Sequence, residues 1–336
     1  MPNTEYSKPN NSAVFCPACS SDRISNCWPT TRCRGNKMIL WCGSCGFGWQ
    51  HPLPTPEEIR YYYDNSPTYN FHDTGEKAIG FKRRIRRINH FKPNLGRLLD
   101  IGSGLGDFLN LSMQSGWQVI GIEPQESAAN VCEERFGIKP QVFVFDQIRF
   151  DPGIFDVVTI WDVWEHVHKP LEFIERCINL LNPGGLLALS IPNSSGYPAR
   201  LFKGRWRYVM FTHLNYFKIH YVDNIMARRG MQNVWADHTV KVQSILQGIE
   251  GFLPFTLKTE QIIRMGRKTD TSFHAKRDRE PVHQKKMANS ISLLNGIRRL
   301  VHKFNLRPLP IAMGDMVDLY FVKKTRVSRS TPDLDG

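Results

Sequence analysis

The sequence predicts an α/β protein in which helices cover both faces of a mainly parallel sheet. One observation is an apolar strand at 98–101 that runs into a turn with glycine at alternate positions, 102, 104 and 106, and then into a helix. A second is the alternation of strand-like and helical segments from residue 96 onward. A third is a pair of C-x-x-C motifs near the N-terminus, which predicts a small separate ribbon.

The periodicity places each element of the sheet in order. Strands are expected at 98–101, 117–123, 142–145, 155–161, 186–191, 231–240 and 316–322, and the helices between them at 108–115, 127–136, 171–181 and 222–229. Upstream, Thr55 and Glu58 form a capping box for a short helix that begins at Pro56. A longer helix at 76–91 has an apolar face, and its arginines, Arg84 among them, are expected on a solvated basic side.

The glycine turn predicts a nucleotide-type cofactor, because glycine lets a ligand approach the backbone closely. A dinucleotide fingerprint would need glycine at position 107, where this chain has Asp107. A carboxylate there would repel a pyrophosphate at the helix start. S-adenosylmethionine has no phosphate and carries positive sulfonium and ammonium groups, which suit Asp100 and Asp107. Glu123 lies 21 positions after Gly102, near the spacing at which a carboxylate binds ribose hydroxyls.

The cysteines are concentrated in the N-terminal segment, where six of the eight fall between positions 16 and 45. In a reducing compartment such clustering favours a metal over disulfides. The two C-x-x-C motifs supply four thiolates for a tetrahedral zinc site: Cys16, Cys19, Cys42 and Cys45. Four protein ligands leave no open position, so we expect a structural zinc ion. Cys27 and Cys33 are interpreted as ordinary small residues.

Several motifs in sequence resemble those of class I S-adenosylmethionine-dependent methyltransferases, over about residues 96–240. They are Leu99-Asp100-Ile101-Gly102-Ser103-Gly104-Leu105-Gly106, Glu123, Phe155-Asp156-Val157-Val158, Glu165-His166-Val167 and Leu181-Asn182-Pro183-Gly184-Gly185. The resemblance implies a doubly wound, Rossmann-like sheet of seven strands with the last one antiparallel.

A narrower resemblance rests on the cysteine pairs, on Pro-Leu-Pro-Thr-Pro-Glu-Glu-Ile after them, and on His213-Leu214-Asn215-Tyr216-Phe217. It is to bacterial zinc-ribbon methyltransferases that act on sugars, including sugar C-methyltransferases and relatives linked to surface polysaccharides and natural products. In the C-methyltransferases a Tyr-x-Glu-His motif helps to enolise a keto-sugar. This chain has Met210-Phe211-Thr212-His213 there, so only the histidine is kept.

The resemblance also implies site residues. The methionine part of the cofactor would be lined by Asp100, Gly102, Ser103, Gly104 and Gly106. Glu123 would bind the ribose hydroxyls, and Asp146 would face the adenine. Trp161, Asp162 and Val163 would lie along the cofactor beside the methyl-transfer point. His213, Glu165 and His166 are the catalytic candidates, since a hydroxyl or carbon acid needs a base. The alternatives are that His213 only hydrogen-bonds a backbone carbonyl, and that Glu165 and His166 cap or pack.

The predicted function is methylation of a sugar or similar small molecule in glycan or secondary metabolite biosynthesis, with S-adenosylmethionine as cofactor and zinc as structural metal. An RNA methyltransferase is the second hypothesis, because a zinc ribbon and a basic surface also occur with rRNA substrates. The fourth strand, however, is not followed by an Asn-Pro-Pro-Tyr type motif, which is used for base amino groups. A non-catalytic cofactor-binding scaffold is the third.

The positive charge of the chain is unevenly distributed. The formal net charge is +13, and residues 241–336 hold 18 Lys and Arg against 9 Asp and Glu.

We expect a ribbon at 1–50, a linker with helices at 51–95, the methyltransferase domain at 96–325 and a disordered tail at 326–336. An insertion at 245–312 is interpreted as packing on its own domain, with a lid, an anionic-lipid contact or an oligomer contact as alternatives. The N-terminus lacks a basic and apolar leader, which predicts a cytoplasmic protein.

Overall fold

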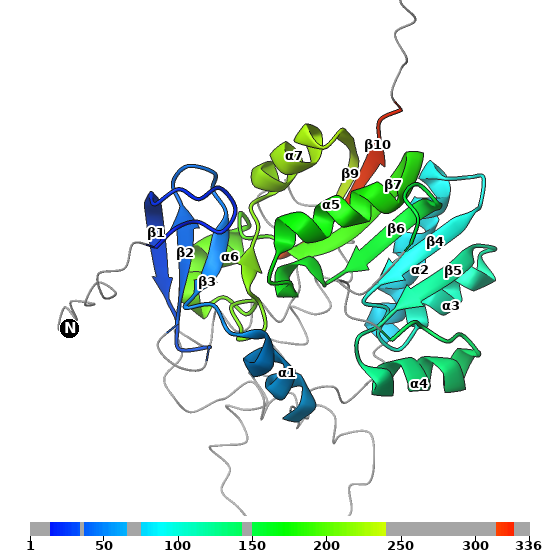
Figure 1. The fold of residues 1–336 in the computed structure, drawn as a ribbon, viewed down its shortest axis with the longest axis horizontal. Helices are drawn as coiled ribbons and strands as arrows, with labels where there is room; N and C mark the ends of the chain where they lie inside the picture. The colour runs from blue at the N-terminus through cyan, green and yellow to red at the C-terminus, as the bar shows by residue number, and fades with distance from the viewer. Residues whose placement is uncertain (1–13, 34–36, 66–74, 143–149, 240–313, 326–336) are drawn as a thin grey trace, which may run out of the picture.

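The computed structural model describes residues 14–33, 37–65, 75–142, 150–239 and 314–325, which form two sheets (Figure 1). The central sheet has the order β5-β4-β6-β7-β10-β9. Its strands are β4 (Arg97–Ile101), β5 (Gln118–Ile122), β6 (Phe155–Trp161), β7 (Leu181–Pro192), β9 (Met231–Thr239) and β10 (Met316–Lys323). The first four are parallel, and β10 runs antiparallel to both of its neighbours, which confirms the predicted α/β class.

The third predicted strand, at 142–145, falls mostly outside the described residues. Gln141, just before it, forms a parallel bridge with Ile122 of the edge strand β5. Asp146, the insertion at 245–312 and the tail at 326–336 also lie outside the described residues.

Helices cover both faces of the sheet because its strands alternate two sets of apolar side chains. Leu98 and Val157 pack in a cluster with residues of α2 (Gly75–Phe91) and α3 (Asp107–Gln114). Their neighbours Leu99 and Val158 point the other way, into a cluster with residues of α5 (Pro170–Leu180) and α7 (Ile219–Arg228). Helix α4 (Glu126–Phe136) follows β5.

The second sheet is antiparallel and contains the ribbon. Its strands are β1 (Ile24–Pro29), β2 (Met38–Cys42), β3 (Gly48–His51) and β8 (Asn215–Tyr216). Strand β8 comes from beyond β7, so the later part of the chain supplies the edge strand of the ribbon sheet. A mixed aromatic cluster joins the two parts, with Trp28 and Trp41 from the ribbon and Trp206 and Tyr216 from the later segment.

Helix α1 (Pro56–Asn65) follows the ribbon and has the predicted capping box. The amide of Thr55 donates to Glu58 Oε2 at 2.8 Å, and the amide of Glu58 donates to Thr55 Oγ1 at 3.2 Å. Within the described ranges no helix is long and apolar enough to cross a bilayer.

The fifth strand begins earlier than the motif Leu181-Asn182-Pro183-Gly184-Gly185 predicts. The motif ends helix α5 as expected, but it already belongs to β7, because Leu181 pairs with Phe155 of β6 before the register shifts. Asn182 Nδ2 donates to Asp156 Oδ1 at 2.7 Å, which fixes this irregular start to the neighbouring strand.

Candidate functional site

The glycine turn lies at the carboxyl end of β4, where open α/β sheets bind their ligands. Gly102, Gly104 and Gly106 have φ values of +75°, +54° and +80°, which favour glycine over other residues. A side chain at Gly102 would collide with Val163, and one at Gly106 with Cys132 of α4. The turn is therefore held close to the loop after β6 on one side and to α4 on the other.

Glu123 connects this turn to the loop after β5. Its Oε2 accepts the amide of Gly104 at 2.8 Å and its Oε1 accepts the amide of Gln125 at 3.0 Å. The carboxylate is buried, and burial raises its pKa while the two amide bonds lower it. Each oxygen keeps a lone pair for a further donor, such as a ribose hydroxyl.

Asp100 is buried within β4 and accepts a hydrogen bond of 2.6 Å from Thr159 Oγ1 of β6. Burial raises the pKa of Asp100 to about 7. Asp107 begins α3 and forms an ion pair of 2.8 Å with Arg135 of α4. Of the two acids that favoured S-adenosylmethionine over a dinucleotide, Asp100 is enclosed in the sheet and Asp107 is paired at the helix start.

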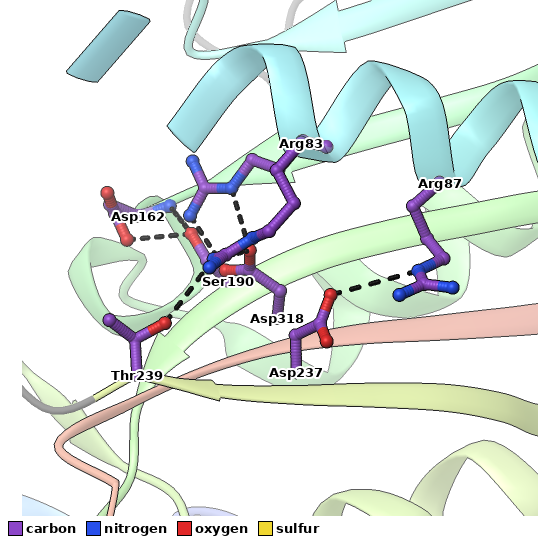
Figure 2. A network of polar contacts seen from close by, with 8 residues as sticks. Arg83, Arg87, Asp162, Ser190, Asp237, Thr239 and Asp318 are labelled. Carbon is purple, nitrogen blue, oxygen red and sulfur yellow. Dashed lines mark hydrogen bonds and ion pairs between the residues drawn. The ribbon is translucent and has the colours of Figure 1, made fainter. Parts of the chain in front are cut away.

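Trp161 ends β6, and Asp162 and Val163 follow it in the loop beside the turn. Asp162 has a φ of +59°, a value that few non-glycine residues adopt. Ser190 of β7 holds it there, because Ser190 Oγ donates to Asp162 Oδ1 at 2.7 Å and accepts the Asp162 amide at 2.9 Å. Figure 2 shows this pair beneath helix α2.

Helix α2 reaches the site through Arg84, and the expectation of a solvated Arg84 is wrong. Its guanidinium binds both oxygens of Asp318 at 2.7 and 3.0 Å and stacks on Trp161 with its carbon 4.3 Å from the ring centroid. Asp318 is an acid inside the apolar strand β10, so it requires a buried cation. Arg83 and Arg87 extend this network to Asp318 and Asp237 (Figure 2). An acid within an apolar run is the sequence signal that could have indicated a buried arginine here.

Glu165, His166 and His213 come together in the structure although His213 is distant in sequence. One ligand atom from each lies within 4.8 Å of the others, and the two imidazole centroids are 4.6 Å apart. The first two belong to a 3₁₀ turn, Trp164–His166, that follows β6. The loop before β8 brings His213, and the amide of Leu214 donates to the carbonyl of Glu165 at 2.8 Å.

The cluster consists of ionisable side chains, and two of them are almost fully buried. Glu165 is 1% exposed and His213 is 5% exposed. Burial and the nearby Asp162 raise the pKa of Glu165 well above its ordinary value. Burial lowers the pKa of His166 to about 4, and burial together with His166 holds the pKa of His213 well below its usual range. Both imidazoles are therefore neutral near pH 7.

Two atoms of the cluster, Glu165 Oε2 and His213 Nδ1, are buried without a hydrogen-bond partner among the described residues. Such atoms are costly unless a ligand or water satisfies them. His213 does have the backbone hydrogen bond that was the alternative to a catalytic role, to Tyr208. That bond uses only one ring nitrogen.

The four cysteines of the C-x-x-C motifs form a second cluster, with all Sγ atoms within 4.8 Å of one another. The Sγ atoms of Cys16 and Cys45 are 3.7 Å apart, and those of Cys19 and Cys42 are 3.5 Å apart. Four thiolates around zinc at ~2.3 Å would be roughly 3.8 Å apart, so the arrangement fits that ion.

Backbone amides support the thiolates of this cysteine cluster. The amides of Ser44 and Cys45 donate to Cys42 Sγ at 3.3 and 3.4 Å. Burial opposes ionisation of Cys42, but these bonds bring its pKa down to about 7. Cys27 and Cys33 lie outside the cluster.

The ribbon also holds the loop that carries His213. Strand β3 pairs with β8, and the amide of Gln50 donates to the carbonyl of Leu214 at 2.9 Å. The buried side chain of Gln50 donates to the carbonyl of Phe211 at 3.1 Å. Thus residues on both sides of His213 are hydrogen-bonded to the ribbon.

Comparison with known proteins indicates the family of the domain. Residues 75–235 match the family model described as "Methyltransferase domain". A ubiquinone biosynthesis O-methyltransferase of Albidiferax ferrireducens is 32% identical over 120 residues, covering 33% of this chain and 48% of that protein. Its counterpart from Xanthomonas campestris pv. campestris is 36% identical over 103 residues, covering 29% and 43%.

The crystal structure of a SAM dependent methyltransferase from Archaeoglobus fulgidus is 18% identical, covers 78% of this chain and 100% of that one, and has a TM-score of 0.46. The chain spans about half the length of the curated relatives it matches. The match over residues 75–235, the sheet order and the glycine turn support the class I, S-adenosylmethionine-dependent methyltransferase domain that the motifs predicted.

Proposed function

We propose that the protein transfers the methyl group of S-adenosylmethionine to a hydroxyl of a small molecule, with a sugar-like molecule as the first candidate. The observation that carries this proposal is the buried cluster of Glu165, His166 and His213, which begins two residues after the Val163 that lies against the glycine turn. A domain of this class needs polar groups for its acceptor at that place.

The cofactor side of the site would be formed by the turn and by Glu123. When bound, S-adenosylmethionine supplies a methyl carbon that is open to attack, and its sulfur keeps the electron pair of the broken C–S bond. Glu123 is already fixed by two amides, so it would receive the ribose hydroxyls without rearranging. Val163 would separate the cofactor from the acceptor and help to exclude water.

The acceptor oxygen must lose its proton as it gains the methyl group. His213 is the residue that we propose for this step, because its Nδ1 is buried, neutral and unpartnered among the described residues. Glu165 and His166 surround it. A hydroxyl is favoured over a carbon acid because the Tyr-x-Glu-His run is reduced to its histidine. The curated relatives are also named O-methyltransferases.

We further infer that the four cysteines bind a structural zinc ion and that the chain belongs to the zinc-ribbon group. Four thiolates would leave the ion no open position, so its contribution is to fold the ribbon. The ribbon in turn holds the loop around His213 through Gln50. Thiolates of this kind persist in a reducing compartment, which supports the cytoplasm as the location.

The test is a labelling experiment with the purified chain and S-adenosylmethionine carrying a labelled methyl group. We expect label in a pool of nucleotide sugars or phenolic small molecules, with S-adenosylhomocysteine formed in equal amount. A Glu123→Ala variant, which should not hold the cofactor, is the matched control. Label that enters total RNA instead would favour the RNA hypothesis. No transfer to any pool, despite measurable cofactor binding, would favour the scaffold hypothesis and overturn the proposal.

A further inference from the structure

The cluster of Glu165, His166 and His213 has a feature that a proton acceptor alone does not need: a carboxylate and two imidazoles converge on one point. A single base with one orienting partner would serve general base catalysis. Here one ligand atom from each of three side chains lies within 4.8 Å of the others, in a region where Glu165 and His213 are almost fully buried. Two nitrogens and one oxygen form a donor set that binds divalent first-row cations.

The hydrogen bonds fix which ring nitrogen of each histidine is available. Nδ1 of His166 lies 2.9 Å from the carbonyl of Thr212 and 3.2 Å from the hydroxyl of Tyr63. A carbonyl only accepts, whereas a hydroxyl can also accept, so Nδ1 carries the proton and Nε2 keeps its lone pair. His213 bonds the carbonyl of Tyr208, and its Nδ1 has no partner among the described residues. Its protonated nitrogen is therefore Nε2, and Nδ1 keeps the lone pair.

A histidine that binds a metal commonly donates its other ring N–H to a backbone carbonyl, which sets the tautomer and the ring orientation. Both histidines of the cluster have this arrangement. The third group, Glu165, offers a buried oxygen, Oε2, that is also without a partner among the described residues. Each of the three side chains thus presents an unprotonated ligand atom or an unsatisfied oxygen to the same small volume.

We propose that Glu165, His166 and His213 bind one divalent cation, such as Mn²⁺, separate from the ion inferred at the four cysteines. Bonds of ~2.1 Å to nitrogen and oxygen would place the ligand atoms roughly 3–4 Å apart. Small side-chain rotations close the present separation. Three protein ligands leave positions open for water or for an acceptor, in contrast to four thiolates.

The cation would give the proposed function its acceptor chemistry, and this part of the inference rests on that function. An acceptor hydroxyl bound at an open position would have a lower pKa, because the cation stabilises the alkoxide or phenolate. With the cation bound, Nδ1 of His213 would be a ligand and no longer the base, so the hydroxyl proton would pass to water, and the oxygen would then form its bond to the methyl carbon as the C–S bond breaks. An acceptor with two neighbouring oxygens would occupy two open positions at once.

Binding of Mn²⁺ alone, without acceptor or S-adenosylmethionine, tests the cation site by itself. The zinc-loaded protein is titrated with Mn²⁺, and the EPR signal of free Mn²⁺ measures the bound amount. Hard cations such as Mn²⁺ avoid thiolates, so the cysteine cluster should not compete. We expect one Mn²⁺ per chain in the wild type, and at least a tenfold weaker affinity in Glu165→Gln and in His213→Gln.

The matched control is His168→Gln, since His168 is close in sequence but bonds the carbonyl of Pro54 instead of joining the cluster. It should bind Mn²⁺ as the wild type does. Retained S-adenosylhomocysteine binding shows that each variant is folded. If a cluster variant does not fold, NMR of the wild type replaces it: a second equivalent of diamagnetic Zn²⁺, added to the zinc-loaded protein, should shift the imidazole signals of His166 and His213 far more than that of His168.

Absence of Mn²⁺ binding in the wild type, or unchanged binding in both cluster variants, would overturn the proposal. A shift of the His168 signal without a shift of the His166 and His213 signals would also overturn it. Mn²⁺ binding without any methyl transfer would leave the cation site standing and remove only the proposed function. Methyl transfer by a protein that binds no Mn²⁺ would leave the proposed function standing and remove only the cation site.

Discussion

The cysteine cluster and the carboxylate–histidine cluster differ in how their polar atoms are supported. Around the cysteines, backbone amides donate to Cys16 and Cys42, and the four Sγ atoms are already at tetrahedral spacing. Around Glu165 and His213, a carboxylate oxygen and a ring nitrogen lie buried with no partner among the described residues. The first arrangement fits one ion, whereas the second leaves two buried polar atoms for a ligand or water to satisfy.

The two clusters also differ in where their parts come from. The cysteines lie within one ribbon, and their spacing alone brings them together. His213 reaches Glu165 only because β8 adds to the ribbon sheet and positions the preceding loop. The ribbon thus supports the loop that carries His213, on the proposed acceptor side of the site. Variants of the ribbon and variants of His213 test this dependence separately.

The largest expected effect is that of a Cys42→Ser, Cys45→Ser double variant. The binding energy of a structural zinc ion is folding energy for its ribbon, so the ribbon should unfold. We expect methyl transfer to be lost, because Gln50 no longer holds the loop around His213, while S-adenosylhomocysteine binding changes by less than about threefold. Zinc content, titration calorimetry and turnover measure the three quantities. A parallel loss of cofactor affinity would contradict the separation of the two regions.

The second effect is that of His213→Ala, which acts on the acceptor side directly. Loss of a group that receives the acceptor proton, or that holds the ion on which the acceptor ionises, should lower kcat/KM about 10²–10⁴-fold. Cofactor affinity should stay as in the wild type, since the hydrogen bonds that fix Glu123 to the glycine turn and to Gln125 do not involve His213. His168→Ala is the control, with activity kept. Equal activity of the two variants would show that His213 only packs.

A third test uses Asp100, a carboxylate as buried as Glu165 but with Thr159 as its partner. Its pKa of about 7 in the fold exceeds the ordinary value of 3.8. The folded state therefore favours the protonated acid, and this stability is complete below about pH 4 and is lost as pH rises to 7. Between pH 5 and 8 the loss should be about 2–3 kcal/mol for the cofactor-free protein.

Asp100→Asn removes that titration and keeps the acceptor oxygen for Thr159. Urea unfolding of both proteins at pH 5 and pH 8, without cofactor, gives the comparison. The difference in unfolding free energy should move in favour of the Asp100→Asn variant at the higher pH. A difference that is the same at both pH values would mean that Asp100 does not titrate in this range.

Most of the fold could be predicted from the sequence because its information is local. The alternation of apolar segments located β4 to β7. The glycine turn and Glu123 were both named from residues adjacent to strand ends, and the structure joins them by a hydrogen bond. The spacing of two C-x-x-C motifs was enough for the cysteine cluster.

What could not be predicted depends on contacts across the fold. The partnership of Arg84 with Asp318 joins helix α2 to the last described strand, and helical periodicity alone placed Arg84 in solvent. His213 could be named as a candidate, but its position beside His166 follows from the pairing of β3 with β8. Neither contact has a spacing rule in the sequence.

The smallest effect is expected for a substitution of Glu123, which is a buried carboxylate and can therefore be compared directly with Glu165. Both carboxylates are buried, but each oxygen of Glu123 has an amide partner, whereas Glu165 Oε2 has none among the described residues. Glu123→Gln keeps the size of the side chain, and one of its two amide bonds must be lost, because the Nε2 group donates instead of accepting. A hydrogen bond to a charged group contributes about 1.5–3 kcal/mol, so the Kd for S-adenosylhomocysteine should rise roughly 10-fold or more.

Glu165→Gln is the paired variant, and it should leave that Kd unchanged while abolishing acceptor methylation, because it removes charge only where the site is open. Titration calorimetry at pH 7.5 measures both affinities. If Glu165→Gln weakened cofactor binding as much as Glu123→Gln does, the two carboxylates would serve one ligand, and the division into a satisfied cofactor side and an unsatisfied acceptor side would fail.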